Sequence, residues 1–279
     1  MDEQTQTQQP YRRFYIPPLP KDTTDRNHTS PFAFTGNKFE FRAPGSSQNC
    51  AQSQMVLNTI VAESIDAICD RLDTMKGPFN EKLQRLLQYE VKAHKRVIFS
   101  GDGYSEEWPR EAARRGLPNL RDTPAALAPL KERRNVELFE RYGVLSRSEM
   151  LSRWEIGMDD YRRRIRIEAG IALEIARSMV RPVVADEFSR LANALGQAKS
   201  DGLKVGIRGL TALSSKLGAG LDDLHVKCDR LERTITRDER PEKQLAAMDD
   251  LRKTVDRLEG LVDDSRWPLP KYREMLFVY

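Results

Sequence analysis

The sequence predicts a mainly α-helical protein with one short β-strand near its N-terminus. From about residue 51 onward, apolar residues recur with the period of an amphipathic helix. Residues 10–49 differ from this pattern, because they are rich in Pro, Gly, Thr and aromatic residues, and Pro removes backbone donors. Within them, residues 37–42 alternate polar and apolar side chains, as a strand does. We therefore expect a short strand followed by a bundle of about six helices.

Composition limits the class of protein. The chain has 279 residues, of which 39% are hydrophobic and 32% charged, and its mean hydropathy is -0.62. This is polar for a globular protein, yet too apolar for a wholly disordered one. The 46 Lys and Arg residues nearly balance the 42 Asp and Glu residues. The resulting net charge of +4 is spread along the chain and gives little ground for nucleic-acid binding.

The sequence also predicts where the protein resides. No uncharged run approaches the roughly 18–20 residues that cross a bilayer, so we expect no membrane span. Residues 1–9 are Gln- and Thr-rich and lack an apolar core, which indicates a flexible N-terminus rather than a secretory signal. Cys50, Cys69 and Cys228 are odd in number and lack metal-ligand spacing. They are typical of reduced thiols in a cytoplasmic protein.

The predicted strand places three charged side chains on one face. Because side chains alternate along a strand, Phe39 and Phe41 lie on one face, and Lys38, Glu40 and Arg42 lie on the other. Glu40 could bind a hard cation such as Mg²⁺ through oxygen, and Arg42 could pair with a carboxylate or phosphate. The same pattern is typical of a cross-strand ion-pair ladder on a solvated sheet face. Spacing by itself leaves both interpretations open.

The helices follow the strand in a regular order. They are expected over 51–76, over 79–98, after a cap at Ser105, from Thr123, over 147–195, over 203–236 and over 241–262. Gly77 and Pro78 end the first helix. Ser146 and Glu149 form a capping box ahead of the long helix, and Pro182 predicts a kink within it.

The C-terminal third of the chain is expected to fold as a helical hairpin with a docked tail. Residues 203–262 carry Leu and Val at near-heptad spacing, which favours an antiparallel hairpin over a coiled coil with a partner. Pro241 suits the first turn of the second helix. The tail WPLPKYREMLFVY (267–279) is aromatic, so we expect it to dock on the protein.

Several blocks of the sequence resemble one known family. These blocks include DRNHTSPFAFTGNKFEFRAPGSSQ (25–48), VLNTIVAE (56–63), HKRVIFSGDGYSEEWPREAARRGLPNL (94–120), NVELFERYGVLS (135–146) and WPLPKYREMLF (267–277). Together they resemble the C-terminal portion of type III glutamine synthetase, that is, the end of its catalytic domain and its C-terminal helical extension. The resemblance does not include residues 1–9, which are expected to be flexible from their composition. It implies a partial catalytic domain at 10–76 and a C-terminal helical domain at 77–279. The expected strand would be a remnant of the catalytic domain. Residues 190–262 carry no recognised motif of the family.

The resemblance implies roles for a few residues. The glutamate of the family's E-F-R strand motif binds a catalytic divalent metal, Mg²⁺ or Mn²⁺, and corresponds to Glu40. The arginine that binds the substrate glutamate corresponds to Arg42, and the basic residue near the nucleotide phosphates corresponds to Lys38. The reaction implied is phosphorylation of glutamate by ATP, followed by displacement of phosphate by ammonia. A metal beside an arginine suits this chemistry, since both stabilise charge on a transferring phosphoryl group.

Two departures from the family pattern reduce the expected activity. The family's N-R-[ST] motif supplies an arginine that stabilises the phosphoryl intermediate, but here it contains His28 between Asn27 and Thr29. A neutral imidazole lacks the permanent charge and the five donors of a guanidinium group. The chain also lacks an E-x-E or H-x-H pair, and one carboxylate is too few ligands for Mg²⁺. We therefore expect these 279 residues to be inactive by themselves.

Three functional hypotheses remain at this stage. The first is the C-terminal portion of a cytoplasmic glutamate–ammonia ligase, which the family implies is a ring-shaped homo-oligomer without nucleic-acid or membrane partners. The second is a non-catalytic helical interaction or regulatory protein derived from that enzyme. The third is nucleic-acid binding by the arginines at 162–166, although these also suit a solvated, ion-paired helix face. His225 and Cys228 share a helix face, but two ligands do not make a metal site.

Overall fold

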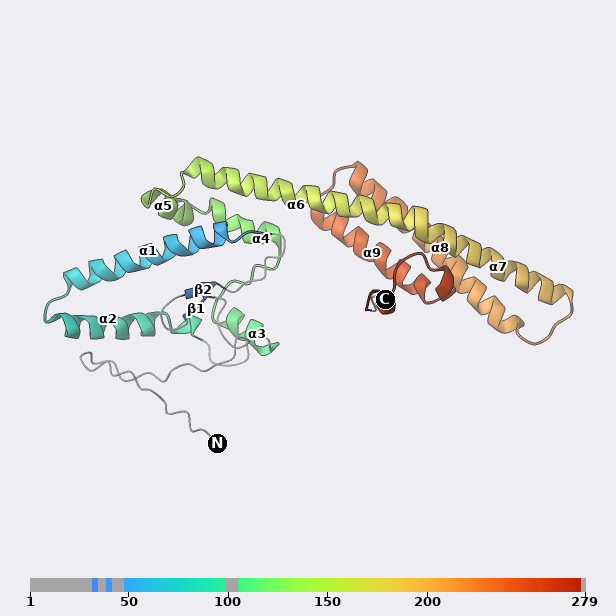
Figure 1. Ribbon diagram of the computed structural model, residues 1–279, viewed down its shortest axis with the longest axis horizontal. Coiled ribbons are helices and arrows are strands. Elements are labelled where there is room, and N and C mark those ends of the chain that lie inside the picture. Colours follow the sequence, from blue (N-terminus) through green and yellow to red (C-terminus); the bar gives the residue numbers. More distant parts are fainter. Residues whose placement is uncertain (1–31, 35–38, 42–47, 99–104, 277–279) are drawn as a thin grey trace, which may run out of the picture. The chain divides into compact units, whose positions relative to one another are not determined.

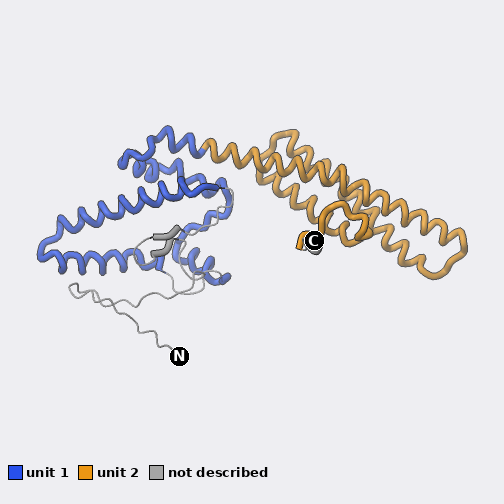
Figure 2. The backbone as a smooth tube through the Cα atoms, viewed as in Figure 1, with its two compact units in different colours: residues 1–154 blue, residues 155–279 orange. Residues whose placement is uncertain are grey.

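The computed structural model describes residues 32–34, 39–41, 48–98 and 105–276, and this part of the chain is predominantly helical (Figure 1). The mainly α class is therefore confirmed. The chain divides into two compact units, unit 1 (residues 1–154) and unit 2 (residues 155–279) (Figure 2). The domain boundaries expected from the sequence stay a prediction. No helix within the described ranges has both the length and the apolar character needed to cross a membrane.

Unit 1 combines a two-stranded hairpin with several helices. Its elements are β1 (Phe32–Phe34), β2 (Phe39–Phe41), α1 (Ala51–Thr74), α2 (Phe79–Ala93), the 3-10 helix η2 (Lys95–Val97), α3 (Glu107–Arg114), α4 (Thr123–Leu127), the 3-10 helix η3 (Ala128–Lys131) and α5 (Arg133–Arg141). Strands β1 and β2 pair antiparallel. The sequence analysis did not anticipate β1, because its three residues are all apolar and lack the alternation that marks β2.

Local sequence signals account for several helix starts in unit 1. The capping box is present: the Ser146 amide donates to Glu149 Oε2 at 2.8 Å, and the Glu149 amide donates to Ser146 Oγ at 3.3 Å. The Ser146 amide and the Ser146 hydroxyl both donate to the Glu149 carboxylate, which lowers the pKa of Glu149. Helix α4 begins at Thr123 as expected, with the Asp122 side chain as its cap. The cap expected at Ser105 is displaced by one residue, because Glu106 occupies the N-cap position of α3.

A small apolar core joins α1 to α5. Its buried members are Val136, Phe139, Leu145 and Met150, with Met55, Val56 and Leu130 packed against them. Two polar contacts reinforce the pair: Arg141 Nη1 donates to both carboxylate oxygens of Glu63 at 2.9 Å, and the Tyr142 hydroxyl donates to Asp66 Oδ2 at 2.6 Å. The bond to Asp66 raises the pKa of Tyr142, because loss of the phenolic proton would place two negative charges together.

Unit 2 is built from long helices and a docked tail. Helix α6 (Arg147–Ile175) begins in unit 1 and ends in unit 2. The elements that follow in unit 2 are the π-helical turn η4 (Ala176–Val180), α7 (Arg181–Ser200), α8 (Ile207–Thr236), α9 (Pro241–Glu259), the 3-10 helix η5 (Asp264–Arg266) and α10 (Tyr272–Leu276). The interruption predicted at Pro182 is therefore a π-helical turn just before it. Pro182 has no amide hydrogen to donate, so the regular ladder cannot continue there.

Helices α7, α8 and α9 pack together around the core of unit 2 (Figure 1). Their fully buried leucines are Leu217, Leu224, Leu231, Leu251 and Leu258. The antiparallel hairpin predicted for residues 203–262 is confirmed, with Pro241 in the first turn of α9. Helix α8 begins later than expected, because Gly206 takes a left-handed conformation with φ of 85° at its N-cap.

Two glycines set how closely α8 approaches its neighbours. A Cβ atom at Gly220 would lie 2.5 Å from Leu258 Cδ2 and 3.3 Å from its Cγ. A Cβ atom at Gly218 would lie 3.1 Å from Phe188 Cε2. Leu258 is 1% exposed, so it has little room to move aside. Glycine at position 220 is thus required by the close contact between α8 and α9.

A polar network centred on Asp223 also joins α8 to α9. Asp223 Oδ2 accepts hydrogen bonds from Thr254 Oγ1 at 2.7 Å and from Arg257 Nη2 at 2.6 Å, and it lies 3.0 Å from Lys227 Nζ. Lys227 Nζ in turn donates to Thr254 Oγ1 at 2.7 Å. The Thr254 hydroxyl, followed by Lys227 and Arg257, lowers the pKa of Asp223.

The beginning of the C-terminal tail docks on unit 2, as predicted. Trp267 is 8% exposed within the apolar core, and Leu269 packs against that core. Arg266 Nη1 donates to Glu187 Oε2 at 3.3 Å, and Arg190 Nη2 donates to Glu187 Oε1 at 2.5 Å. The Glu187 side chain is only 3% exposed, so these two arginines provide the compensation that a buried carboxylate requires.

Replacing Gly220 with alanine should destabilise unit 2. The added methyl group overlaps Leu258, so we expect Gly220→Ala to lower the free energy of unfolding by about 1–3 kcal/mol. The matched control is Gly209→Ala in the same helix, where nothing lies within 4 Å of the new Cβ atom. That change should raise stability by roughly 0.5 kcal/mol, because alanine is the better helix former. Equal stability of the two variants in urea denaturation would contradict the close-contact argument.

The Asp223 network should make stability depend on pH. Because folding lowers the pKa of Asp223, the ionised carboxylate stabilises the native state above the ordinary Asp pKa of 3.8, and this contribution is lost as the pH falls below it. We expect Asp223→Asn to cost about 1 kcal/mol at pH 7 and progressively less between pH 5 and pH 3. Urea unfolding at several pH values measures this difference. The neighbouring exposed control Asp222→Asn should show no such convergence with wild type.

Candidate functional site

The structure places one of the four residues expected at a catalytic site. Glu40 stands at the centre of β2, directly opposite Ala33 of β1. His28, Lys38 and Arg42 lie outside the described residues. Whether these four residues meet around one substrate therefore stays a prediction. The antiparallel pairing of β1 with β2 thus fixes the backbone position of Glu40 within the hairpin.

The described side chains do not form a metal site among themselves. In residues 48–98 and 105–276, no three or more His, Cys, Asp or Glu side chains are grouped so that they could hold a metal ion. Cys228 is 1% exposed, and burial raises the pKa of its thiol. His225 Nε2 lies 3.7 Å from Asp229 Oδ2, one turn further along α8. Cys228 thus belongs to the apolar core, whereas the His225 side chain is exposed beside Asp229.

Three of the four arginines at 162–166 form ion pairs. Arg162 Nη1 lies 3.3 Å from Asp159 Oδ1, and Arg164 Nε lies 2.8 Å from Asp160 Oδ2, both within α6. Arg166 reaches the loop after α8, where its Nη1 lies 3.3 Å from Asp238 Oδ1. This is the arrangement that the ion-paired helix face predicts. Three of these cations already have carboxylate partners, which reduces the charge available for a phosphate backbone.

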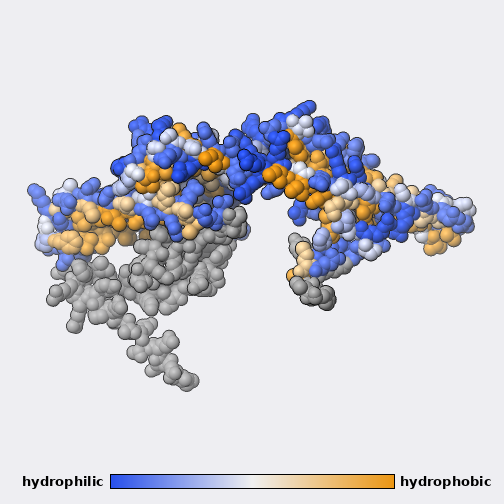
Figure 3. All heavy atoms as spheres, turned by 45° about the horizontal axis from the view of Figure 1, so that its top comes forward, coloured by the Kyte–Doolittle hydropathy of each residue, from blue (hydrophilic) through white to orange (hydrophobic). Residues whose placement is uncertain are grey.

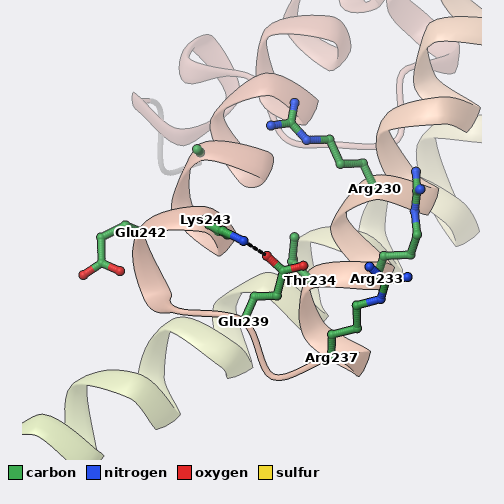
Figure 4. Close-up of a pocket in the computed structure, with 8 residues that line it drawn as sticks. Arg230, Arg233, Thr234, Arg237, Glu239, Glu242 and Lys243 are labelled. Atoms are coloured by element: carbon green, nitrogen blue, oxygen red, sulfur yellow. Dashed lines mark ion pairs between the residues drawn. The ribbon is translucent and has the colours of Figure 1, made fainter.

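The pocket with the clearest chemistry lies at the turn between α8 and α9. It is a cavity of about 580 Å³. Four cationic side chains contribute to its lining, together with two carboxylates, a hydroxyl and a methyl group: Arg230, Arg233, Arg237, Lys243, Glu239, Glu242, Thr234 and Ala246 (Figure 4). The volume falls within the range of small-molecule pockets, roughly 300–1,000 Å³. We call this cavity the hairpin pocket.

The sequence analysis did not identify the hairpin pocket, although a signal for it exists. Arg230, Arg233 and Arg237 are separated by three and then four residues, which places them along one face of α8. Thr234 also lies on α8, whereas the other lining residues come from the turn and the start of α9: Glu239, Glu242, Lys243 and Ala246. Only the tight turn brings these four residues beside the arginines. The spacing of the arginines could therefore have predicted the α8 side of the pocket, whereas the α9 side forms only when the hairpin folds.

Comparison with known proteins relates nearly the whole chain to one family. Residues 82–199 match the model of the glutamine synthetase C-terminal domain. The chain is 37% identical over 285 residues to the type-3 glutamine synthetase of Dictyostelium discoideum, and 33% identical over 290 residues to the glutamine synthetase of Bacteroides fragilis. It is 35% identical over 270 residues to the glutamine synthetase of Butyrivibrio fibrisolvens. These matches cover 92–94% of this chain but 38% of each relative, so the chain spans well under half of their length.

Proposed function

We propose that the chain is the C-terminal portion of a glutamate–ammonia ligase, because residues 82–199 match the glutamine synthetase C-terminal domain and 92–94% of the chain is similar to glutamine synthetases. In the complete enzyme, ATP would phosphorylate glutamate to γ-glutamyl phosphate, and ammonia would displace the phosphate to give glutamine. Glu40 would bind Mg²⁺ or Mn²⁺, Arg42 the substrate glutamate and Lys38 the nucleotide phosphates. The enzyme would be a cytoplasmic homo-oligomeric ring.

The observation that carries this proposal is the extent of the similarity. It covers at least 92% of the chain, including the strand with Glu40, and is not confined to one helix pair. The matched segment is 38% of each relative, which leaves most of the relatives' length outside the match. Mg²⁺ is bound in near-octahedral geometry, so Glu40 needs carboxylates or substrate oxygens from elsewhere. We therefore propose that these 279 residues do not catalyse by themselves.

The surface of unit 1 supports a larger assembly. Helix α1 has 24 residues, of which Thr59 is buried. The apolar side chains of Ile60 and Ile65 on this helix are 40% and 55% exposed. On α2, Phe79 and Val91 are 58% and 60% exposed. Apolar side chains are visible over these helices in Figure 3. Exposed apolar residues on neighbouring helices are typical of a contact surface. We propose that the remainder of the enzyme contacts this surface of α1 and α2.

A second candidate function is a non-catalytic helical protein that binds or regulates the enzyme. His28 favours it, because the substitution replaces a permanently charged guanidinium group at a position where the family stabilises phosphoryl transfer. The same exposed helices would then contact the enzyme as a separate protein. The two candidates make different predictions for Glu40. Glutamine synthesis requires Glu40 if the chain is part of the catalytic enzyme, and does not require it if the chain is a non-catalytic binding protein.

A chimeric enzyme would test the catalytic proposal. Residues 10–279 are joined to the upstream part of the Dictyostelium enzyme, and ATP-dependent formation of glutamine from glutamate and ammonia is measured. We expect activity in the chimera, none in the isolated chain, and a loss of about 100-fold in Glu40→Gln, because a metal ligand is removed. The exposed carboxylate variant Glu155→Gln should retain activity. A folded chimera without activity, or an active Glu40→Gln variant, would favour the non-catalytic candidate.

The same chimera tests the effect of His28. We expect His28→Arg to raise kcat about tenfold, since a guanidinium group stabilises the developing phosphoryl charge better than a neutral imidazole. His94→Arg is the matched control, because the His94 side chain is 67% exposed at the end of α2. No increase for His28→Arg, or the same increase for both variants, would show that position 28 does not limit turnover.

A further inference from the structure

The hairpin pocket contains more positive charge than its own carboxylates neutralise. Lys243 Nζ lies 2.8 Å from Glu239 Oε2, and Arg230 Nη1 lies 2.6 Å from Asp250 Oδ2, so these two cations are paired. Arg233 Nε donates to the backbone carbonyl of Asp229 at 3.2 Å. Neither Arg233 nor Arg237 is ion-paired with a carboxylate in the described part of the chain. Two guanidinium groups of the lining therefore keep donors available.

These two arginines are close to each other along the chain, and both line the hairpin pocket. They are four residues apart at the end of α8, so they lie on the same face of the helix. Like charges at this spacing repel each other, although the negative end of the helix dipole partly offsets the repulsion. An anion bound between the two guanidinium groups would remove this repulsion.

The two carboxylates of the lining do not cancel this charge. Glu239 forms an ion pair with Lys243, and that bond, together with the nearby positive charge of Arg237, lowers the pKa of Glu239. In the close-up view, the Glu242 side chain points away from the arginines (Figure 4). Thr234 is 7% exposed, and its hydroxyl donates to the Leu231 carbonyl at 2.7 Å. Arg233 and Arg237 are thus the two lining cations for which the described residues provide no carboxylate ion pair.

We propose that the hairpin pocket binds a small anion with two linked phosphate groups, either free pyrophosphate or the diphosphate of a nucleotide. A guanidinium group presents two parallel donors to a phosphate, and two such groups match two phosphates. The cavity of about 580 Å³ is larger than a single phosphate requires. This site rests on the residues of unit 2 and is independent of the proposed ligase activity.

Calorimetric titration of the 279-residue chain at low ionic strength tests the proposal. The probes are sodium pyrophosphate, ADP and orthophosphate. We expect one equivalent of pyrophosphate or ADP to bind with a Kd below about 1 mM, and orthophosphate to bind at least tenfold more weakly, since it spans one guanidinium group. In Arg233→Gln/Arg237→Gln the affinity for pyrophosphate should fall at least tenfold. Both side chains are exposed, so the variant should melt like wild type.

The control removes the same charge from elsewhere in α8. Arg208→Gln/Lys216→Gln replaces two exposed cations outside the pocket and should leave the affinity within about twofold of wild type. Tighter binding of ADP than of pyrophosphate would identify a nucleotide as the ligand, and equal binding would identify the phosphates alone. The proposal is overturned if neither probe binds, if orthophosphate binds equally well, or if the control loses as much affinity as the pocket variant.

Discussion

The structure of unit 2 depends on the close contact between α8 and α9. Gly220 lets the two helices approach until Leu258 occupies the space that a side chain at 220 would fill. This approach buries the leucines that face the hairpin interior, and it brings Thr254, which is 0% exposed, within hydrogen-bonding distance of Asp223 and Lys227. Apolar burial and the polar network therefore share one geometric requirement. The tail docks on the same core through Trp267.

Charge has three different roles in this chain. Along α6, arginines pair with carboxylates one turn away, which stabilises a solvated helix only weakly. At Glu187, two arginines compensate a buried carboxylate and connect α7 to the tail. At the hairpin pocket, Arg233 and Arg237 border a cavity without carboxylate partners in the described residues. The first two arrangements complete the fold by themselves, whereas the third is complete only with an anion.

The two units relate differently to function. Unit 1 contains the strand with Glu40 and exposes apolar residues on α1 and α2, so its chemistry is proposed to require the remainder of the enzyme. Unit 2 forms the larger apolar core, with buried leucines on α7, α8 and α9. The apolar residues exposed on α1 and α2 would be stabilised by contact with another protein surface. The α8–α9 hairpin has its own core, so the hairpin pocket can form without such a contact.

The sequence by itself determined the helical class, the capping box at Ser146 and the hairpin of α8 and α9, because these depend on periodicity and local hydrogen bonds. It also identified Glu40 as the candidate metal ligand, on a motif that the structure places in β2. Only the tertiary structure revealed β1, the buried Glu187 with its two arginines, and the hairpin pocket. Arg266 and Glu187 are 79 residues apart, and no local pattern links residues so distant. Such contacts arise only when packing brings separate helices together.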